Sequence, residues 1–222
     1  MKTTELQAVK YLKKILITLL YSTIIILAPA NSNATIISEL YITEVMANPS
    51  QVSDSNGEWF ELYNPTNEAV SLNGITLSDN GANSHLINNP APLLVDPGQY
   101  FVLGKNANEL TNGGYSVDYQ YSGFTLGNTD DEIILSDLEG NILSLLYENG
   151  FVTDGKSSEL IPTTTSFSHY SITESFTYGL GDYGTPGNVG SYQFSTMSVS
   201  EPSSLWLALA GSIMLLRKRK KN

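Results

Sequence analysis

Apolar and polar residues alternate with a period of two along the middle of this 222-residue chain. In the stretch GEWFELYNP, Phe60 and Leu62 lie on one face of an extended strand, and the residues between them lie on the other. Asn64-Pro65 ends this strand, because proline lacks the amide hydrogen that a strand ladder needs. Similar alternating runs predict five further strands, at residues 39–45, 99–104, 115–121, 131–136 and 141–147.

Turn signals rich in glycine, asparagine and aspartate separate these runs. They lie at residues 73–74, 79–81, 96–98, 112–114 and 139–141. No interior stretch shows the 3.6-residue period of an amphipathic helix. Many short strands at this spacing predict an all-β sandwich or barrel, and about 165 residues are enough for a single core.

The N-terminus has the layout of a secretory signal peptide. Lysines precede an uncharged apolar run, Ile15–Ala28, which is followed by Pro29 and by small residues at Ser32 and Ala34. As a helix the run would rise only about 21 Å, against roughly 30 Å of hydrocarbon in a bilayer. We therefore predict cleavage after Ala34 by signal peptidase; the alternative is an uncleaved membrane anchor.

The C-terminus carries a second short apolar segment, Ser203–Leu216, behind the pair Glu201-Pro202. A basic cluster closes the chain: Arg217, Lys218, Arg219, Lys220 and Lys221. These features resemble the PEP-CTERM sorting signal of bacteria that build extracellular polysaccharide matrices, although Ser200 stands where that family often has proline. The resemblance implies a transient inner-membrane form and processing by an exosortase-like membrane enzyme. An ordinary tail anchor is the alternative.

The interior resembles the lamin-tail domain, which is an immunoglobulin-like β-sandwich. The resemblance is carried by YITEVMANP, GEWFELYNPTNEAVSLNGITLSD, LVDPGQYFVLGKN, GFTLGNTDDEIILSDLEGNIL and YGTPGNVG. It implies an all-β immunoglobulin-like sandwich, to which the two ends of the chain add an N-terminal signal peptide and a C-terminal apolar helix. The expected organisation is a signal peptide at 1–34, a lamin-tail-like sandwich at 35–190, a linker at 191–199 and a sorting signal at 200–222.

The distribution of charge along the chain argues against one class of function, nucleic-acid binding. Residues 35–200 carry 20 acidic residues against only Lys105 and Lys156, a formal charge of −18. This balance argues against nucleic acid as a partner, because binding there depends on neutralising phosphates. The chain has no cysteine, which excludes disulfides, thiolate metal sites and a cysteine nucleophile.

The sequence contains few combinations of residues that could form a catalytic site. Glu44 and Glu61 could serve as the carboxylate pair of a glycosidase, but both fall in lamin-tail motifs and are expected to have structural roles, at strand edges or in hydrogen bonds to turns. His85 and His169 are far apart and lack metal-ligand spacing. No nucleophile elbow, phosphate-binding loop or dinucleotide motif occurs. We therefore predict that the protein is not an enzyme.

Two acidic loops offer hard oxygen ligands of the kind that calcium prefers. The candidates are Asp54, Glu58, Asp130, Asp131 and Glu132. Neither loop is an EF-hand, and solvated loop acids are the ordinary explanation, so no cofactor is predicted beyond this calcium alternative. Tyr115, Tyr119 and Tyr121 share a parity with Val117; they could stack on sugar rings, but we expect this face to belong to the core.

The expected function is that of an exported protein, associated with the cell surface or the extracellular matrix, which acts by binding or structural contact. The alternatives are a calcium- or glycan-binding adhesin and a secreted hydrolase. The expected partners are the secretion translocon, signal peptidase and an exosortase-like enzyme, with polysaccharide or surface proteins left open as ligands.

Overall fold

The computed structural model describes residues 36–162 and 169–191. The predicted cleavage site at Ala34, the sorting signal at 200–222 and all but the first residue of the linker lie outside the described residues. Within them the chain forms two single-turn helices, η1 (Ile37–Glu39) and α2 (Asp54–Gly57), and otherwise short strands. No described helix is long and apolar enough to cross a membrane.

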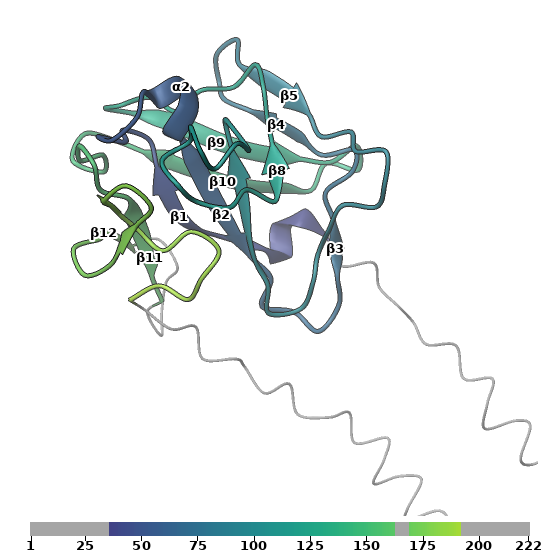
Figure 1. The fold of residues 1–222 in the computed structure, drawn as a ribbon. Helices are drawn as coiled ribbons and strands as arrows, with labels where there is room; N and C mark the ends of the chain where they lie inside the picture. The colour runs from purple at the N-terminus through teal and green to yellow at the C-terminus, as the bar shows by residue number, and fades with distance from the viewer. Residues whose placement is uncertain (1–35, 163–168, 192–222) are drawn as a thin grey trace, which may run out of the picture. The chain divides into compact units, whose positions relative to one another are not determined.

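Two sheets build the fold (Figure 1). The six-stranded sheet has the order β12-β11-β1-β2-β7-β8, and all of its pairs are antiparallel except β7–β8. Its strands are β12 (His169–Ile172), β11 (Ser158–Ile161), β1 (Tyr41–Met46), β2 (Trp59–Tyr63), β7 (Tyr100–Gly104) and β8 (Tyr119–Gln120).

The second sheet has four antiparallel strands in the order β10-β9-β4-β5. They are β10 (Ile142–Tyr147), β9 (Asp131–Ser136), β4 (Thr76–Ser78) and β5 (Ser84–Leu86). Two small ribbons complete the described strands, β3 (Val70–Ser71) with β6 (Leu94–Val95), and β13 (Thr177–Tyr178) with β14 (Asp182–Tyr183).

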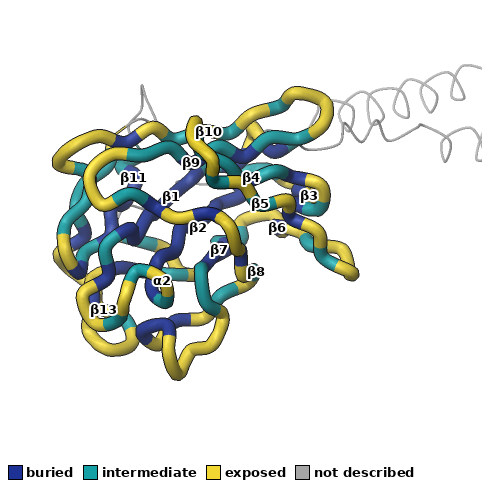
Figure 2. The backbone as a smooth tube through the Cα atoms, turned by 90° about the horizontal axis from the view of Figure 1, so that it is seen from above, coloured by how far each residue is buried: buried dark blue, intermediate teal, exposed yellow. Residues whose placement is uncertain are grey.

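The main core lies between the two sheets. The inward residues Phe60 and Leu62 of β2 are fully buried and belong to one cluster with Leu77, Ile133 and Leu135 of the second sheet. Strands β1 and β2, in the middle of the six-stranded sheet, are also buried on their other face, as their dark tube in Figure 2 shows. Loops and the C-terminal segment, which we define as residues 182–191, cover that second face.

A smaller cluster fills part of the second face. Trp59 packs there with Met46, Val102 and Tyr115, and its Nε1–H donates to the Tyr178 hydroxyl at 3.1 Å. Because β2 is covered on both faces, all five of its residues are buried, whichever face their side chains lie on. The alternation predicted which residues share a face, but it gave no sign that both faces are covered.

The predicted sandwich is confirmed for the described residues. Five of the six predicted strands are present, as β1, β2, β7, β9 and β10. The sixth, at 115–121, is wrong: only Tyr119–Gln120 forms a strand, because residues 112–118 form a loop that the Asn112 and Asp118 side chains bond to the main chain. The turn prediction holds at Gly74, where φ is +88° and a side chain would be strained.

Candidate functional site: a row of buried glutamates

Three glutamates lie side by side on the covered face of the six-stranded sheet. Glu44 of β1 is directly opposite Glu61 of β2 on one side and Glu159 of β11 on the other. Directly opposed residues of antiparallel strands point to the same face, with Cβ atoms about 5 Å apart. All three are buried, with exposed fractions of 1%, 1% and 4%. We call these three residues the glutamate row.

Two members of the row bind the C-terminal segment. Glu44 accepts the backbone N–H of Thr185 at 2.9 Å and the Thr185 hydroxyl at 2.7 Å, and it also accepts the hydroxyl of Ser157. Glu61 accepts the backbone N–H of Gly187 at 2.7 Å and the Thr43 hydroxyl at 2.7 Å. Both acids thus accept hydrogen bonds from a turn, as expected, but neither lies on an edge strand of the sheet.

The third member is enclosed by the same segment. Gly190 lies so close to Glu159 that a Cβ at this position would overlap the carboxyl group. Asp182 extends the attachment at the other end of the segment, because its carboxylate accepts the backbone N–H groups of Ser50 and Gln51. Carboxylates thus hold the segment at several points along its length.

Burial and mutual repulsion alter the acidity of the row. Burial is the main reason that the pKa of Glu44 rises from 4.5 to about 7, against the opposing effect of its hydrogen-bond donors. Burial also raises the pKa of Glu61 well above its ordinary value, and the neighbouring charge of Glu44 raises it further. Glu44 and Glu61 therefore hold their protons to higher pH than an exposed glutamate does.

A small cavity adjoins the row. It measures about 10 Å³ and is lined by Thr43, Tyr100, Leu160, Gly190 and the three glutamates. That volume matches roughly one water molecule. A sugar ring does not fit, so this arrangement binds the chain's own backbone and does not present two carboxylates to a glycosidic bond.

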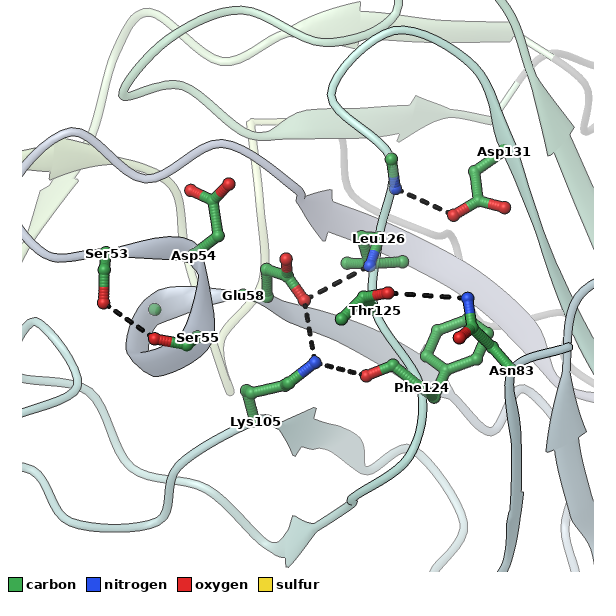
Figure 3. A network of polar contacts seen from close by, with 12 residues as sticks. Ser53, Asp54, Ser55, Glu58, Asn83, Lys105, Phe124, Thr125, Leu126 and Asp131 are labelled. Carbon is green, nitrogen blue, oxygen red and sulfur yellow. Dashed lines mark hydrogen bonds and ion pairs between the residues drawn. The ribbon is translucent and has the colours of Figure 1, made fainter.

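The two acidic loops named as calcium candidates meet in space (Figure 3). The Asn128 amide donates to Asp54 at 2.9 Å, which joins the loop of α2 to the loop before β9. Among residues 36–162 and 169–191, however, no three histidine, aspartate or glutamate side chains are grouped so that they could hold a metal ion. The five candidates do not form one site, and calcium binding stays an untested alternative.

Four of these five acids accept hydrogen bonds through their side chains, whereas one carboxyl oxygen of Glu132 is buried without a hydrogen-bond partner among the described residues. Glu58 is buried, accepts the Leu126 N–H at 3.2 Å and lies 3.6 Å from the Lys105 ammonium, which also donates to the Phe124 carbonyl (Figure 3). Asp131 accepts the N–H groups of Gly127 and Glu132, the fifth candidate, and Asp130 accepts the Thr129 hydroxyl. These bonds shape the two loops, and burial raises the pKa of Glu58 to about 7.

The histidines and tyrosines do not form a catalytic group. His85 shares a hydrogen bond of 2.8 Å with Tyr119, while His169 is exposed on β12 in the other sheet. Tyr115 and Tyr121 are buried as expected, but they do not share one face: Tyr115 belongs to the smaller cluster and Tyr121 to the main core. The parity argument fails here because residues 115–118 are not a strand.

Comparison with known proteins supports the resemblance on which these expectations partly depend. Searches among curated proteins and among solved structures find no match. The family model of the Lamin Tail Domain matches residues 33–149, which is more than half of the chain. The match contains β1 to β10. Strands β11 and β12, which complete the six-stranded sheet, and the C-terminal segment lie beyond it. The chain belongs to the lamin tail domain family.

Proposed function

We propose that this lamin tail domain protein is exported and acts by binding or structural contact rather than by catalysis. The observation that carries the proposal is the role of the glutamate row. If the protein were a glycoside hydrolase, Glu44 and Glu61 would be its candidate pair of catalytic acids. Instead, Glu44 accepts a hydrogen bond from Thr185 and Glu61 accepts one from Gly187 of the same chain. Carboxylates engaged in this way support a structural use of the site.

The proposed route to the cell surface depends on the two ends of the chain. The N-terminal segment passes through the secretion translocon and is cleaved after Ala34, and the Glu201-Pro202 signal then directs an exosortase-like enzyme to the tail. The C-terminal apolar helix holds the protein in the inner membrane during this step. The mature protein reaches the surface or the extracellular matrix, where surface proteins or polysaccharide are its partners.

A turnover assay tests the non-catalytic role. Purified exported protein is expected to release no product from polysaccharide, phosphoester or peptide substrates. A variant with Glu44→Gln and Glu61→Gln serves as the matched control for contaminating activity. Turnover that the wild type shows and this variant lacks would overturn the proposal.

Intact mass and fractionation test export and processing. In a host that possesses the sorting enzyme, changing Glu201 and Pro202 to alanine is expected to leave export intact but retain a larger form in the inner membrane. Changing Ser203 and Ser204 to alanine is the matched control and should be processed as the wild type is. A permanent anchor predicts the same mass and the same membrane fraction for all three proteins.

A further inference from the structure

Strand β10 is an unusually open sheet edge. It pairs with β9 in continuous register from Ile142↔Ser136 to Tyr147↔Asp131, and its other side has no neighbouring strand in the described part of the chain. Its sequence ILSLLY contains no charge, proline or bulge, which are three of the features by which proteins protect an edge, and the single turn η1 contacts the strand. Ile142 and Leu146 are 55% and 61% exposed.

The other described edges of the two main sheets are better protected by their shortness. β5 has three residues and β8 has two, and β12 has four and carries His169. The six residues of β10 therefore offer the longest run of main-chain donors and acceptors to an incoming strand. This difference makes β10 the edge that a partner would select.

A groove accompanies this edge. It has a volume of about 260 Å³ and lies between β10 and the six-stranded sheet. Leu143 and Leu145 line it from β10, and Leu160 of β11 and Tyr170 of β12 line it from the opposite sheet. The six-stranded sheet thus continues past β10 and leaves an apolar floor beneath the position of one more strand. Such a strand could pair with β10 and place every second side chain on this floor.

The charges around the groove indicate the chemistry of the occupant. No charged residue of the described chain lines the groove. Acids stand at both ends of β10, with Asp137 and Glu139 before it and Glu148 after it. Of the two described lysines, Lys105 pairs with Glu58 and Lys156 with Glu174. A strand with an apolar centre and basic ends complements this surface.

A second copy of the protein fits less well. Antiparallel pairing of two copies through β10 would place both six-stranded sheets on the same side of the joined sheet. There β11 and β12 of each copy would compete for one space. The pairing would also add a second domain of formal charge −18.

We propose that β10 and its groove form a strand-addition site for an extended, apolar segment with basic residues at its ends, carried by a partner protein. The segment continues the four-stranded sheet beyond β10 through main-chain hydrogen bonds and covers Leu160 and Tyr170. This inference rests on the proposed function in one respect: it assigns the proposed binding function to a particular surface of the protein. Peptide capture by purified protein can fail while export and processing stand, and the reverse is also true.

The test uses the purified exported protein and a labelled peptide of alternating valine and threonine with two lysines at each end. We expect saturable binding, measured by fluorescence anisotropy, and slower amide hydrogen exchange in residues 142–147 but not in Ser84–Leu86. A peptide with glutamates in place of the lysines is expected to bind roughly tenfold more weakly. Equal binding of the two peptides, or unchanged exchange in β10, would overturn the proposal.

Matched variants locate the site. Ser144→Lys adds a charge to the middle of the open edge and should weaken binding of the lysine peptide by roughly tenfold. Leu110→Lys adds the same charge to the loop between β7 and β8, where Leu110 is 93% exposed, and should change binding by less than about twofold. Equal loss in both variants points to a general charge effect and contradicts the site, as does sedimentation that shows β10 occupied by a second copy.

Discussion

Buried carboxyl groups are the least usual residue choice in this protein. Removing a charged carboxylate from water costs several kcal/mol, and directly opposed like charges add to that cost. Glu44 and Glu61 offset part of it with donors from Thr43, Ser157, Thr185 and Gly187. The remainder appears as a raised pKa, which links the stability of the fold to pH.

The sign of that link can be predicted. Because the pKa of Glu44 rises from 4.5 to about 7 on folding, its stabilising contribution is full below pH 4.5 and is lost as pH increases through 7. Glu61 acts in the same direction. We expect the free energy of unfolding, measured with urea, to be larger at pH 5 than at pH 8 by on the order of 3 kcal/mol.

Relief of general repulsion among acids would produce a trend of the same sign, so the control must isolate the row. Glu44→Gln with Glu61→Gln should remove a large part of the pH dependence, since amides do not titrate, and leave the part that comes from Glu58, whose pKa is also raised to about 7. The control is Glu109→Gln with Glu148→Gln, which replaces two glutamates at exposed positions. This variant should keep most of the pH dependence of the free energy of unfolding. Identical slopes in both double variants would remove the row as the cause.

Two tyrosines allow one substitution to have opposite effects. The Tyr121 hydroxyl is buried without a hydrogen-bond partner among the described residues, so Tyr121→Phe should be neutral or stabilise the fold by up to about 1 kcal/mol. The Tyr147 hydroxyl donates to the Gly127 carbonyl at 2.9 Å, so Tyr147→Phe should cost about 1 kcal/mol. Urea unfolding at one pH measures both, and a loss of stability in Tyr121→Phe would contradict this prediction.

At the scale of elements, Asn64 fixes the loop between β2 and β3. Its amide donates to the carbonyls of Glu68 and Val95 at 2.8 Å, and its side-chain oxygen accepts the Thr66 N–H. The residue is fully buried, so its partners lie largely beyond the reach of water. This explains why the motif NPTN follows the strand GEWFELY.

We expect Asn64→Ala to lower the free energy of unfolding by about 2–3 kcal/mol, because it leaves buried carbonyls unsatisfied. The same substitution at the exposed Asn108, which also caps a turn, should cost less than about 1 kcal/mol. Chemical denaturation of both variants gives the comparison. Equal losses would show that burial does not set the cost.

Strands could be predicted where apolar and polar residues alternate along the sequence, and they could not be predicted elsewhere. β2, β7, β9 and β10 follow from sequence period, because their side chains meet a core on at least one face. β8 did not, because its two residues are held by contacts with distant parts of the chain, which include the pairing with β7 and the hydrogen bond between Tyr119 and His85.

The glutamate row was even less accessible from the sequence. It joins Glu44 to Thr185 across 141 residues, and no local pattern reports such a contact. The sequence did show that glutamates occur in the alternating runs that predict strands, and this indicates an acid on a sheet face. It does not indicate what covers that face.

At the scale of the whole molecule, the acidic charge is dispersed among separate hydrogen-bonded loops. Millimolar calcium is therefore expected to raise the melting temperature by less than about 2 °C. A rise of several degrees that is abolished by Asp130→Ala with Asp131→Ala would favour the calcium-binding alternative. Asp79→Ala, which removes an acid from a different turn, is the matched control.

The place where the C-terminal segment is attached also has a mechanical consequence. Residues 36–40 lead directly into β1, and Thr185 is bonded to Glu44 of that same strand, which lies in the middle of the six-stranded sheet. A pulling force applied between Ile36 and Ser191 therefore passes through β1 and the contacts of the glutamate row. The strands β4 and β5 pair with neither β1 nor the C-terminal segment, so tension reaches them only through the packing of the core, whereas β10 contacts both η1 and β1 and lies beside the loaded strand.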